Sequence, residues 1–325
     1  MYTKELIRQG KTVEDANEGG CSGCIEVGAF GKEAYILTGY LNTPKILEIT
    51  LNNGIDPMTG KKLGLETGDP RTFKTFDELY EAYHKQMVHF VDMKLAVNNY
   101  IERMFSLYAP ATFLSLFIDD CISKGKDYYS GGARYNTTYI QCTGLGTITD
   151  CLSTLKKHVF EDKKFTMDEI LTAVSRNFEG NEKMRQFIIN RTPFFGNDDD
   201  YADTIAVKVY DDLVRAIEGH PNTRGGKTQL NMLSTTCHNY FGSVCGASVN
   251  GRLAKFAISD GTSPAHGADT NGPTAVIKSL GKLDQTKSGG TLLNVRFVPS
   301  LLKRDEDLKK LVSLIRAYFN MGGHH

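Results

Sequence analysis

Apolar residues recur at helical spacing in several stretches of the chain, and two of these stretches begin with a capping signal. Thr75 followed by Glu78 has the spacing of a capping box, and the apolar positions after it predict a long helix to about residue 105. Thr166 followed by Glu169 is a second such pair, again placed just before apolar positions. These local signals predict where two helices begin.

The remaining elements are predicted from spacing with weaker boundary signals. Thr147 is a candidate cap for a helix with Ile148 on its apolar face, and further helices are expected over residues 203–217 and 305–319. Residues 292–298 read as a strand. In the last helix the residues expected to point inward are Leu308, Leu311, Leu314 and Ile315. Helices that alternate with short extended segments indicate an α/β fold.

Glycine-rich loops separate these elements. The chain has 32 glycines and only nine prolines, and its glycines gather in residues 19–31, 131–136, 242–251 and 260–273. Because glycine lets a backbone approach another group closely, these loops are expected to pass near a ligand or another chain segment.

Composition and charge exclude several classes of protein. The 325 residues hold 38 basic and 38 acidic side chains, so the formal net charge is zero and nothing predicts a nucleic acid or anionic membrane partner. Hydrophobic residues make up 40%, which is typical of a globular protein. No apolar run reaches the roughly 20 residues that span a bilayer, and the first residues lack an apolar signal core. A cytoplasmic protein is the expectation.

The cysteines predict reduced thiols. Their number is odd and the chain is long, which argues against a disulfide framework. Cys21 and Cys24 form a C-x-x-C pair, but one pair without a second pair or nearby histidines is weak evidence for a metal site. The seven positions are Cys21, Cys24, Cys121, Cys142, Cys151, Cys237 and Cys245.

The glycine-rich segment Gly19–Glu26 is the first place where chemistry is expected. In an extended loop, residues two apart point to the same side, so Cys24 and Glu26 would face one pocket. A carboxylate raises the pKa of a neighbouring thiol, which disfavours thiolate chemistry and suits a neutral hydrogen-atom carrier beside an acid or base. Spacing alone favours the simpler alternative, a turn with an inert buried cysteine.

Two other segments have simpler structural interpretations. The acidic run at residues 196–203 has ligands for calcium but lacks the glycine and glutamate of an EF-hand loop, so a helix start is favoured. Residues 260–274 carry no phosphate-binding motif and are interpreted as a structural loop. His220, His238 and His266 are scattered, so no metal site or catalytic triad is predicted.

Taken in order, these segments resemble the glycyl radical enzymes of the dehydratase and lyase group. Gly23-Cys24-Ile25-Glu26 matches the G-C-x-E signature of the family. This resemblance overturns the interpretation of Cys24 as inert. Residues 21–35 resemble the branch that dehydrates 4-hydroxyproline, because Val27 stands where choline, diol and glycerol enzymes typically have proline. Further landmarks of the family are residues 131–136, 196–203, 263–269, 272–275 and 293–295.

The resemblance implies a fold and a boundary. The family fold is a barrel of ten strands in two halves, wrapped by helices, and residues 1–325 are expected to form a single unit, the later half-barrel. The N-terminal half and the glycyl radical domain, with its R-V-x-G-Y motif, are expected to be absent, the motif lying beyond His325. The chain would then be an internal piece that is inactive alone.

The resemblance also implies a mechanism. A separate radical S-adenosylmethionine enzyme would install a radical on that outlying glycine, and the chain itself would bind no cofactor or metal. Cys24 would carry the hydrogen atom, Glu26 would handle the proton as water leaves trans-4-hydroxy-L-proline, and Tyr40 and Thr235 would line the substrate pocket. The product would be a pyrroline carboxylate, and the full-length protein is expected to be an anaerobic, cytoplasmic homodimer.

Two alternatives stay open at this point. One is a related radical dehydratase or C–N lyase that acts on glycerol, propanediol or choline, which product analysis would separate. The other is a non-catalytic fragment that docks on a partner, which would be favoured by a genuine stop codon after His325.

Overall fold

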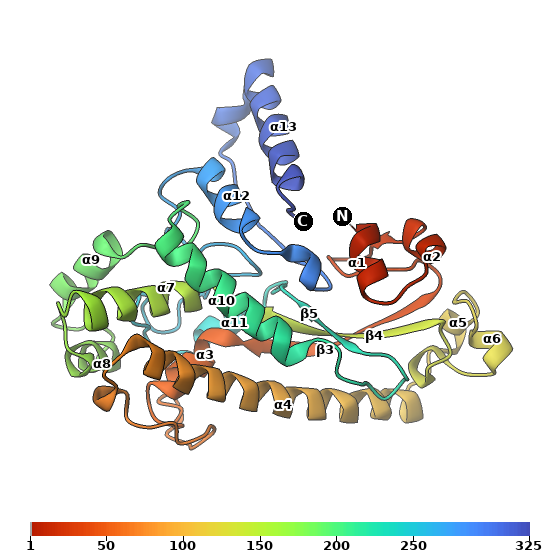
Figure 1. Ribbon diagram of the computed structural model, residues 1–325, viewed down its shortest axis with the longest axis horizontal. Coiled ribbons are helices and arrows are strands. Elements are labelled where there is room, and N and C mark those ends of the chain that lie inside the picture. The colour runs from red at the N-terminus through yellow and green to blue at the C-terminus, as the bar shows by residue number, and fades with distance from the viewer. Residues whose placement is uncertain (1) are drawn as a thin grey trace.

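The computed structural model describes residues 2–325 as helices packed on a small parallel sheet (Figure 1). The strands are β1 (Gly20–Cys21), β2 (Val27–Gly28), β3 (Glu33–Asn42), β4 (Tyr135–Thr143) and β5 (Thr228–Asn231). The α-helices are α1 (Tyr2–Arg8), α2 (Val13–Asn17), α3 (Thr43–Thr50), α4 (Phe76–Tyr108), α5 (Thr112–Ser115), α6 (Cys121–Lys124), α7 (Leu145–Leu155), α8 (Met167–Ser175), α9 (Glu182–Arg191), α10 (Asp200–Ile217), α11 (Cys237–Ser243), α12 (Pro273–Gly281) and α13 (Asp305–Asn320). Shorter turns of helix are η1 (Pro70–Thr72), η2 (Tyr128–Ser130), the π-helical η3 (Lys156–Glu161), η4 (Gln285–Lys287) and η5 (Pro299–Leu302).

The sheet has the order β3-β4-β5, and both strand pairs are parallel. A bulge between Leu37 and Tyr40 shifts the register of β3, so that Tyr40 stands beside Gln141 of β4. An isolated parallel bridge between Met232 and Thr291 brings the segment before residue 292 alongside the continuation of β5. Parallel pairing of distant strands thus places residues from four separate parts of the sequence side by side.

One face of this sheet is buried under the long helices. Ile140 and Cys142 of β4, with Leu230 of β5, belong to the main core together with apolar residues of α3, α4, α7 and α10. Figure 1 shows α4 running the length of the molecule along this side. Because side chains alternate along a strand, the residues between these positions point to the opposite face.

The opposite face carries the hairpin formed by β1 and β2. Tyr139, between the core-facing residues of β4, donates a hydrogen bond from its hydroxyl to Val27 O of the hairpin at 2.7 Å. Val27 also belongs to a small apolar cluster with Leu6 of α1 and Ala16 of α2. The two faces of the sheet therefore serve different purposes, packing on one side and support of the hairpin on the other.

Most predicted helices are confirmed, with some boundaries shifted. The Thr75 cap begins α4, and Thr166 and Glu169 form a complete capping box at α8. The acidic run begins a helix as predicted: Asp199 caps α10, whose first residue, Asp200, lies three residues before the expected start. The prediction for Thr147 is wrong: α7 begins after Gly144, and Thr147 lies inside it, where its hydroxyl accepts a hydrogen bond from Ser259 N at 2.8 Å.

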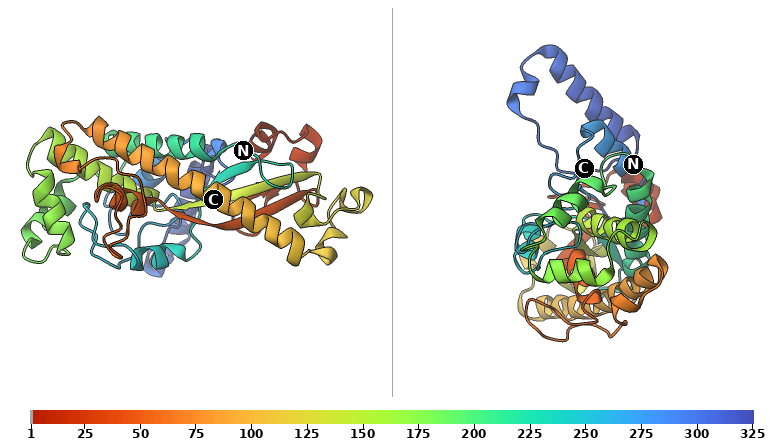
Figure 2. Two further views of the ribbon diagram at one scale, coloured as in Figure 1. Left: turned by 90° about the horizontal axis from the view of Figure 1, so that it is seen from below. Right: turned by 90° about the vertical axis from the view of Figure 1, so that its left-hand side faces the viewer.

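The prediction for the last segments is partly wrong. Helix α13 forms, but Leu308 is 46% exposed and Ile315 is 47% exposed, whereas Leu311 is half-buried and Leu314 packs against the main core, so only half of the expected inward face is covered. Figure 2 shows why, because α13 projects away from the body of the protein. Residues 292–298 form no strand; they lead out towards this projecting helix.

A buried ion pair joins α4 to the loop before β5. Arg224 Nε lies 3.2 Å from Glu102 Oε2, and both side chains are almost wholly buried. Thr138 of β4 completes the group by hydrogen bonding to both partners. Among residues 2–325, no helix is long and apolar enough to cross a membrane.

Candidate active site on the cysteine hairpin

The loop at residues 22–26 closes the hairpin and presents Cys24. Ser22 donates from its backbone nitrogen to Glu26 O at 2.8 Å, and from its hydroxyl to the same oxygen at 3.2 Å. Gly23 has a positive φ of 23°, which a residue with a side chain would adopt at a cost. Cys24 is exposed, whereas Glu26 is only 3% exposed. The Cys24 thiol is thus reachable from outside while the Glu26 carboxylate is covered, and the expectation that both face one pocket stays a prediction.

The hairpin rests on a second glycine-rich segment, Gly289-Gly290. Val27 N donates to Gly289 O at 3.2 Å. A Cβ on Gly290 would stand 2.3 Å from Ile25 O, which is closer than real carbon atoms approach. Only glycine permits this contact, so the backbone at residue 290 fixes the height of the hairpin above the sheet.

The electrostatics keep the hairpin thiols protonated. Burial and the nearby Glu26 raise the pKa of Cys24. Burial, with Glu26 and Cys24 as smaller causes, raises the pKa of Cys21 to about 11. A thiol with a raised pKa carries its hydrogen at neutral pH, which suits hydrogen-atom transfer and not thiolate attack.

The Glu26 carboxylate is only partly satisfied. Its Oε2 accepts a hydrogen bond from Ile25 N at 3.3 Å, while Oε1 is buried without a hydrogen-bond partner. Since buried polar atoms are nearly always paired, Oε1 has capacity for one further donor. A carboxylate with a free, inward-facing oxygen is suited to move a proton to or from a bound molecule.

Tyr40 and Thr235 are brought together by the fold. Their hydroxyl oxygens are 2.9 Å apart, although 195 residues separate them in sequence. Thr235 has a φ of 50°, a left-handed conformation that few threonines adopt. The register places Tyr40 on the sheet face that carries the hairpin. No hydrogen bond joins this pair to Cys24 or Glu26 within residues 2–325.

Sequence reasoning did not find Tyr139, Gln141, Asn231 or the Gly289-Gly290 pair. The two adjacent glycines were the only signal available. The other three residues sit in β4 and β5 without any motif, and only the register of the parallel sheet puts them under the hairpin.

The acidic run at residues 196–203 has a structural role. Lys282 Nζ lies 3.3, 2.7 and 2.7 Å from carboxylate oxygens of Asp198, Asp200 and Asp203, so a lysine neutralises these acids.

All seven cysteines are free, which confirms the expected thiols. In the part of the chain that the structure describes, no group of three or more His, Cys, Asp or Glu is arranged to hold a metal.

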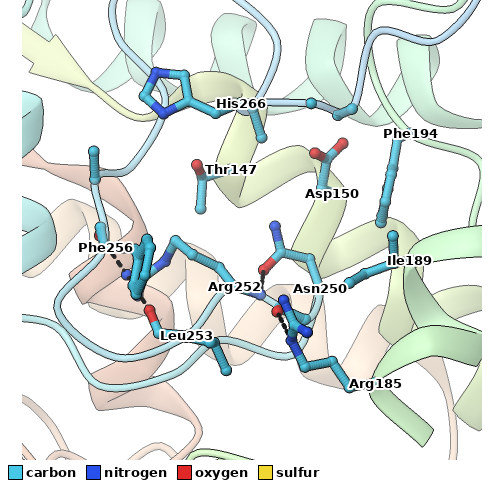
Figure 3. A pocket seen from close by; sticks show the side chains of 15 residues that line it. Thr147, Asp150, Arg185, Ile189, Phe194, Asn250, Arg252, Leu253, Phe256 and His266 are labelled. Carbon is cyan, nitrogen blue, oxygen red and sulfur yellow. Dashed lines mark hydrogen bonds between the residues drawn. The ribbon is translucent and has the colours of Figure 1, made fainter. Parts of the chain in front are cut away.

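A cavity of about 290 Å³ lies away from the hairpin (Figure 3). It is walled by α7, α9 and the loop that carries Asn250 and Arg252, and Figure 3 shows Asp150, Phe194 and His266 around it. None of the four predicted site residues lines it. Cavity size therefore does not locate the candidate site.

Comparison with known proteins places this geometry in context. Residues 1–242 match the family described as pyruvate formate lyase-like, and residues 258–325 match the family described as glycine radical. The chain is 54% identical over 322 residues to a trans-4-hydroxy-L-proline dehydratase of Clostridioides difficile, covering 99% of the chain and 41% of that protein. It is 34% identical to a (2S)-3-sulfopropanediol dehydratase of Klebsiella oxytoca, covering 99% of the chain and 40% of the relative.

Two solved structures superpose on the whole chain. A hydroxyproline dehydratase from Clostridioides difficile with trans-4-hydroxy-L-proline bound gives a TM-score of 0.97 at 53% identity, with 100% of this chain and 41% of that chain covered. A B12-independent glycerol dehydratase from Clostridium butyricum with glycerol bound gives a TM-score of 0.95 at 37% identity, with 100% of this chain and 41% of that chain covered. The expected fold, half of a barrel wrapped by helices, is confirmed by these superpositions.

The chain spans about two fifths of the length of these relatives. The match of residues 258–325 to the glycine radical family corrects the expectation that this domain is absent. The R-V-x-G-Y motif does not occur in the printed sequence, and its expected place beyond His325 stays a prediction, as does the treatment of residues 1–325 as one unit. The two family matches together cover residues 1–242 and 258–325, and the G-C-x-E hairpin lies within the first of them. On this evidence the chain belongs to the glycyl radical enzyme family.

Proposed function

We propose that this chain is the part of a radical dehydratase that carries Cys24 as hydrogen-atom carrier and Glu26 as acid and base. The observation that carries the proposal is the hairpin itself, where an exposed, protonated thiol stands two residues from a buried carboxylate with a free oxygen. We further propose trans-4-hydroxy-L-proline as the substrate of the full-length protein, on the basis of the relative that is 54% identical.

The residues fit a radical supplied from elsewhere in the full-length protein. A glycine outside this chain, activated by a separate radical S-adenosylmethionine enzyme, would supply the unpaired electron. Cys24 then gives up the hydrogen of its S–H bond and takes a hydrogen atom from the substrate carbon beside the ring nitrogen. Because the pKa of Cys24 is raised, the thiol holds that hydrogen at neutral pH until it is taken.

Glu26 serves the second half of the reaction. It moves a proton to the substrate hydroxyl, whose carbon–oxygen bond breaks, so that water leaves, and the proton that the substrate radical then releases restores Glu26. Cys24 returns the hydrogen atom to the product, which is a pyrroline carboxylate, and no net oxidation occurs. The balance is one substrate to one product and one water.

Tyr40 and Thr235 are proposed to contact the substrate. Their mutual hydrogen bond holds two hydroxyl groups in a fixed pair on the hairpin side of the sheet. The partners of the full-length protein would be its activating enzyme and a second copy of itself. Because oxygen destroys such radicals, an anaerobic cytoplasm is the proposed setting.

The experiment uses the full-length protein activated without oxygen. We expect pyrroline carboxylate from trans-4-hydroxy-L-proline, no dehydration of glycerol and no C–N cleavage of choline. Cys24→Ser should abolish turnover, while Cys21→Ser, its matched control on the same hairpin, should keep much of it. Turnover of glycerol in place of hydroxyproline would refute the substrate, and an active Cys24→Ser variant would refute the site.

A further inference from the structure

Asn231 is a buried amide with nothing to bond. It stands at the end of β5 with 0% of its surface exposed, and both its Nδ2 and its Oδ1 lack a hydrogen-bond partner. An unpaired buried polar group costs about 1–3 kcal/mol. Two such groups on one side chain are unusual, and the position of Asn231 in the sheet suggests what they bind.

The register places Asn231 under the cysteine hairpin. Tyr40 pairs with Gln141, and Gln141 pairs with Asn231, so the three side chains form one row across the sheet. Neighbours in register point to the same face. That face also holds Tyr139, two residues before Gln141, which bonds Val27 O of the hairpin.

The carbonyl of Ile25 is an unpaired group of the hairpin that lies close to Asn231. Ile25 is 1% exposed, and its oxygen accepts no hydrogen bond within residues 2–325. From the place where a Cβ on Gly290 would stand, Ile25 O is 2.3 Å away and Asn231 Nδ2 is 3.2 Å away. An unpaired acceptor and an unpaired donor therefore both lie within 3.2 Å of the same point beside Gly290, where the absence of a Cβ leaves room.

We propose that Asn231 is a positioning residue for the cysteine hairpin, and that its Nδ2 donates a hydrogen bond to Ile25 O when the hairpin is seated for hydrogen-atom transfer. Ile25 is the one residue between Cys24 and Glu26, so a bond to its carbonyl sets the height of the thiol and the carboxylate together. This inference rests on the proposed function of the hairpin and adds the residue that aligns it.

The test compares Asn231→Leu with the wild type in the activated full-length protein. Leucine has the same branching and the same number of side-chain heavy atoms but no polar atom, so removal of two unpaired groups should leave the melting temperature unchanged or raise it. A hairpin that is no longer aligned should lose at least about tenfold in kcat, because small misplacements of reacting groups are costly. KM should change less than threefold, and the spin count per protein should equal that of the wild type.

Gln229→Leu is the matched control. Gln229 is two residues earlier on the same face, and its amide nitrogen, oriented to donate, lies 3.0 and 2.6 Å from the carboxylate oxygens of Glu218. Its loss should lower the melting temperature and leave kcat unchanged, the reverse of the pattern for Asn231→Leu.

Each outcome decides the proposal. Wild-type kcat in Asn231→Leu overturns it, and so does a fall in melting temperature with an equal loss of spin, since that is the signature of a merely structural residue. If the wild type itself leaves hydroxyproline intact and dehydrates another compound, the proposed substrate fails, and the kcat of the variant on that other compound decides the role of Asn231.

Discussion

Substitution of Gly290 by alanine should push the cysteine hairpin away from the backbone at residue 290. Gly290 has a φ of 141°, and the added Cβ would stand 2.3 Å from Ile25 O and 3.0 Å from Ile25 C. Both are backbone atoms, so no flexible side chain can move aside to make room. The collision must be relieved by the hairpin or by residue 290 itself.

The size of the effect follows from these distances. Ordinary contacts begin at 3.4 Å, so the backbone at Ile25 must retreat by roughly an ångström. Displacements of about 1 Å at reacting groups cost on the order of 10²-fold in rate. The strained φ adds about 1–3 kcal/mol of destabilisation. We therefore expect kcat to fall by about two orders of magnitude in a protein that still folds.

The assay is turnover by the activated full-length protein, with spin count and melting temperature measured on the same sample. Gly267→Ala is the control, because Gly267 has a φ of 80° and no heavy atom within 4 Å of the added Cβ. The Gly267→Ala variant has the backbone strain without the steric collision, so it should lower the melting temperature and leave kcat unchanged. Equal kcat values for Gly290→Ala and the wild type would show that the hairpin is not held at this height, and the reasoning would fail.

Three further predictions follow from named contacts. Glu26→Gln should reduce dehydration by about 10²–10⁴-fold. It should also speed alkylation of Cys24 by iodoacetamide, since burial and, after it, the carboxylate raise the pKa of that thiol and the substitution removes the second cause; unchanged rates would contradict both. Arg224→Met leaves Glu102 buried without its partner 3.2 Å away and should cost about 3–5 kcal/mol in urea unfolding, much of it restored by adding Glu102→Leu. Burial raises the pKa of Glu218 from 4.5 to about 7. The folded state therefore keeps this proton to a higher pH than the unfolded state, and the free energy of unfolding should fall as pH rises from 5 to 8. Glu218→Gln should make that fall smaller.

What could be predicted from the sequence depended on local signals. The Thr75 cap of α4 and the Thr166–Glu169 box at α8 involve residues three apart, and both formed as expected. Helix α7 begins at Leu145 and not after Thr147, because Gly144 adopts a φ of 101° and ends the preceding extended chain. A side chain there would also collide with Pro44 Cδ at 2.4 Å. That constraint comes from a residue 100 positions away and leaves no trace near Thr147.

In the candidate site too, residues that belong to a local motif could be predicted and residues brought in by distant strands could not. Cys24 and Glu26 are neighbours in sequence and belong to a recognisable motif, so they could be proposed at once. Gln141 and Asn231 reach the site only through the register of strands that are far apart in the sequence. Pairing of this kind depends on the packing of the whole sheet, and alternation along a single strand does not reveal it.

The difference between the two hairpin thiols is the strongest physical reason to assign the transfer to Cys24. Cys21 Sγ lies 3.4 Å from both Ser22 O and Cys24 O, so its hydrogen is already engaged with backbone oxygens. Cys24 Sγ makes no hydrogen bond to any of residues 2–325, and the side chain is exposed. Burial and, to a smaller extent, the nearby Glu26 raise the pKa of both thiols, but only one of them can lose its hydrogen without breaking an existing interaction. Cys21 would then serve to hold the loop at Cys24 O, and the Glu26 carboxylate is left to handle the proton of the departing water.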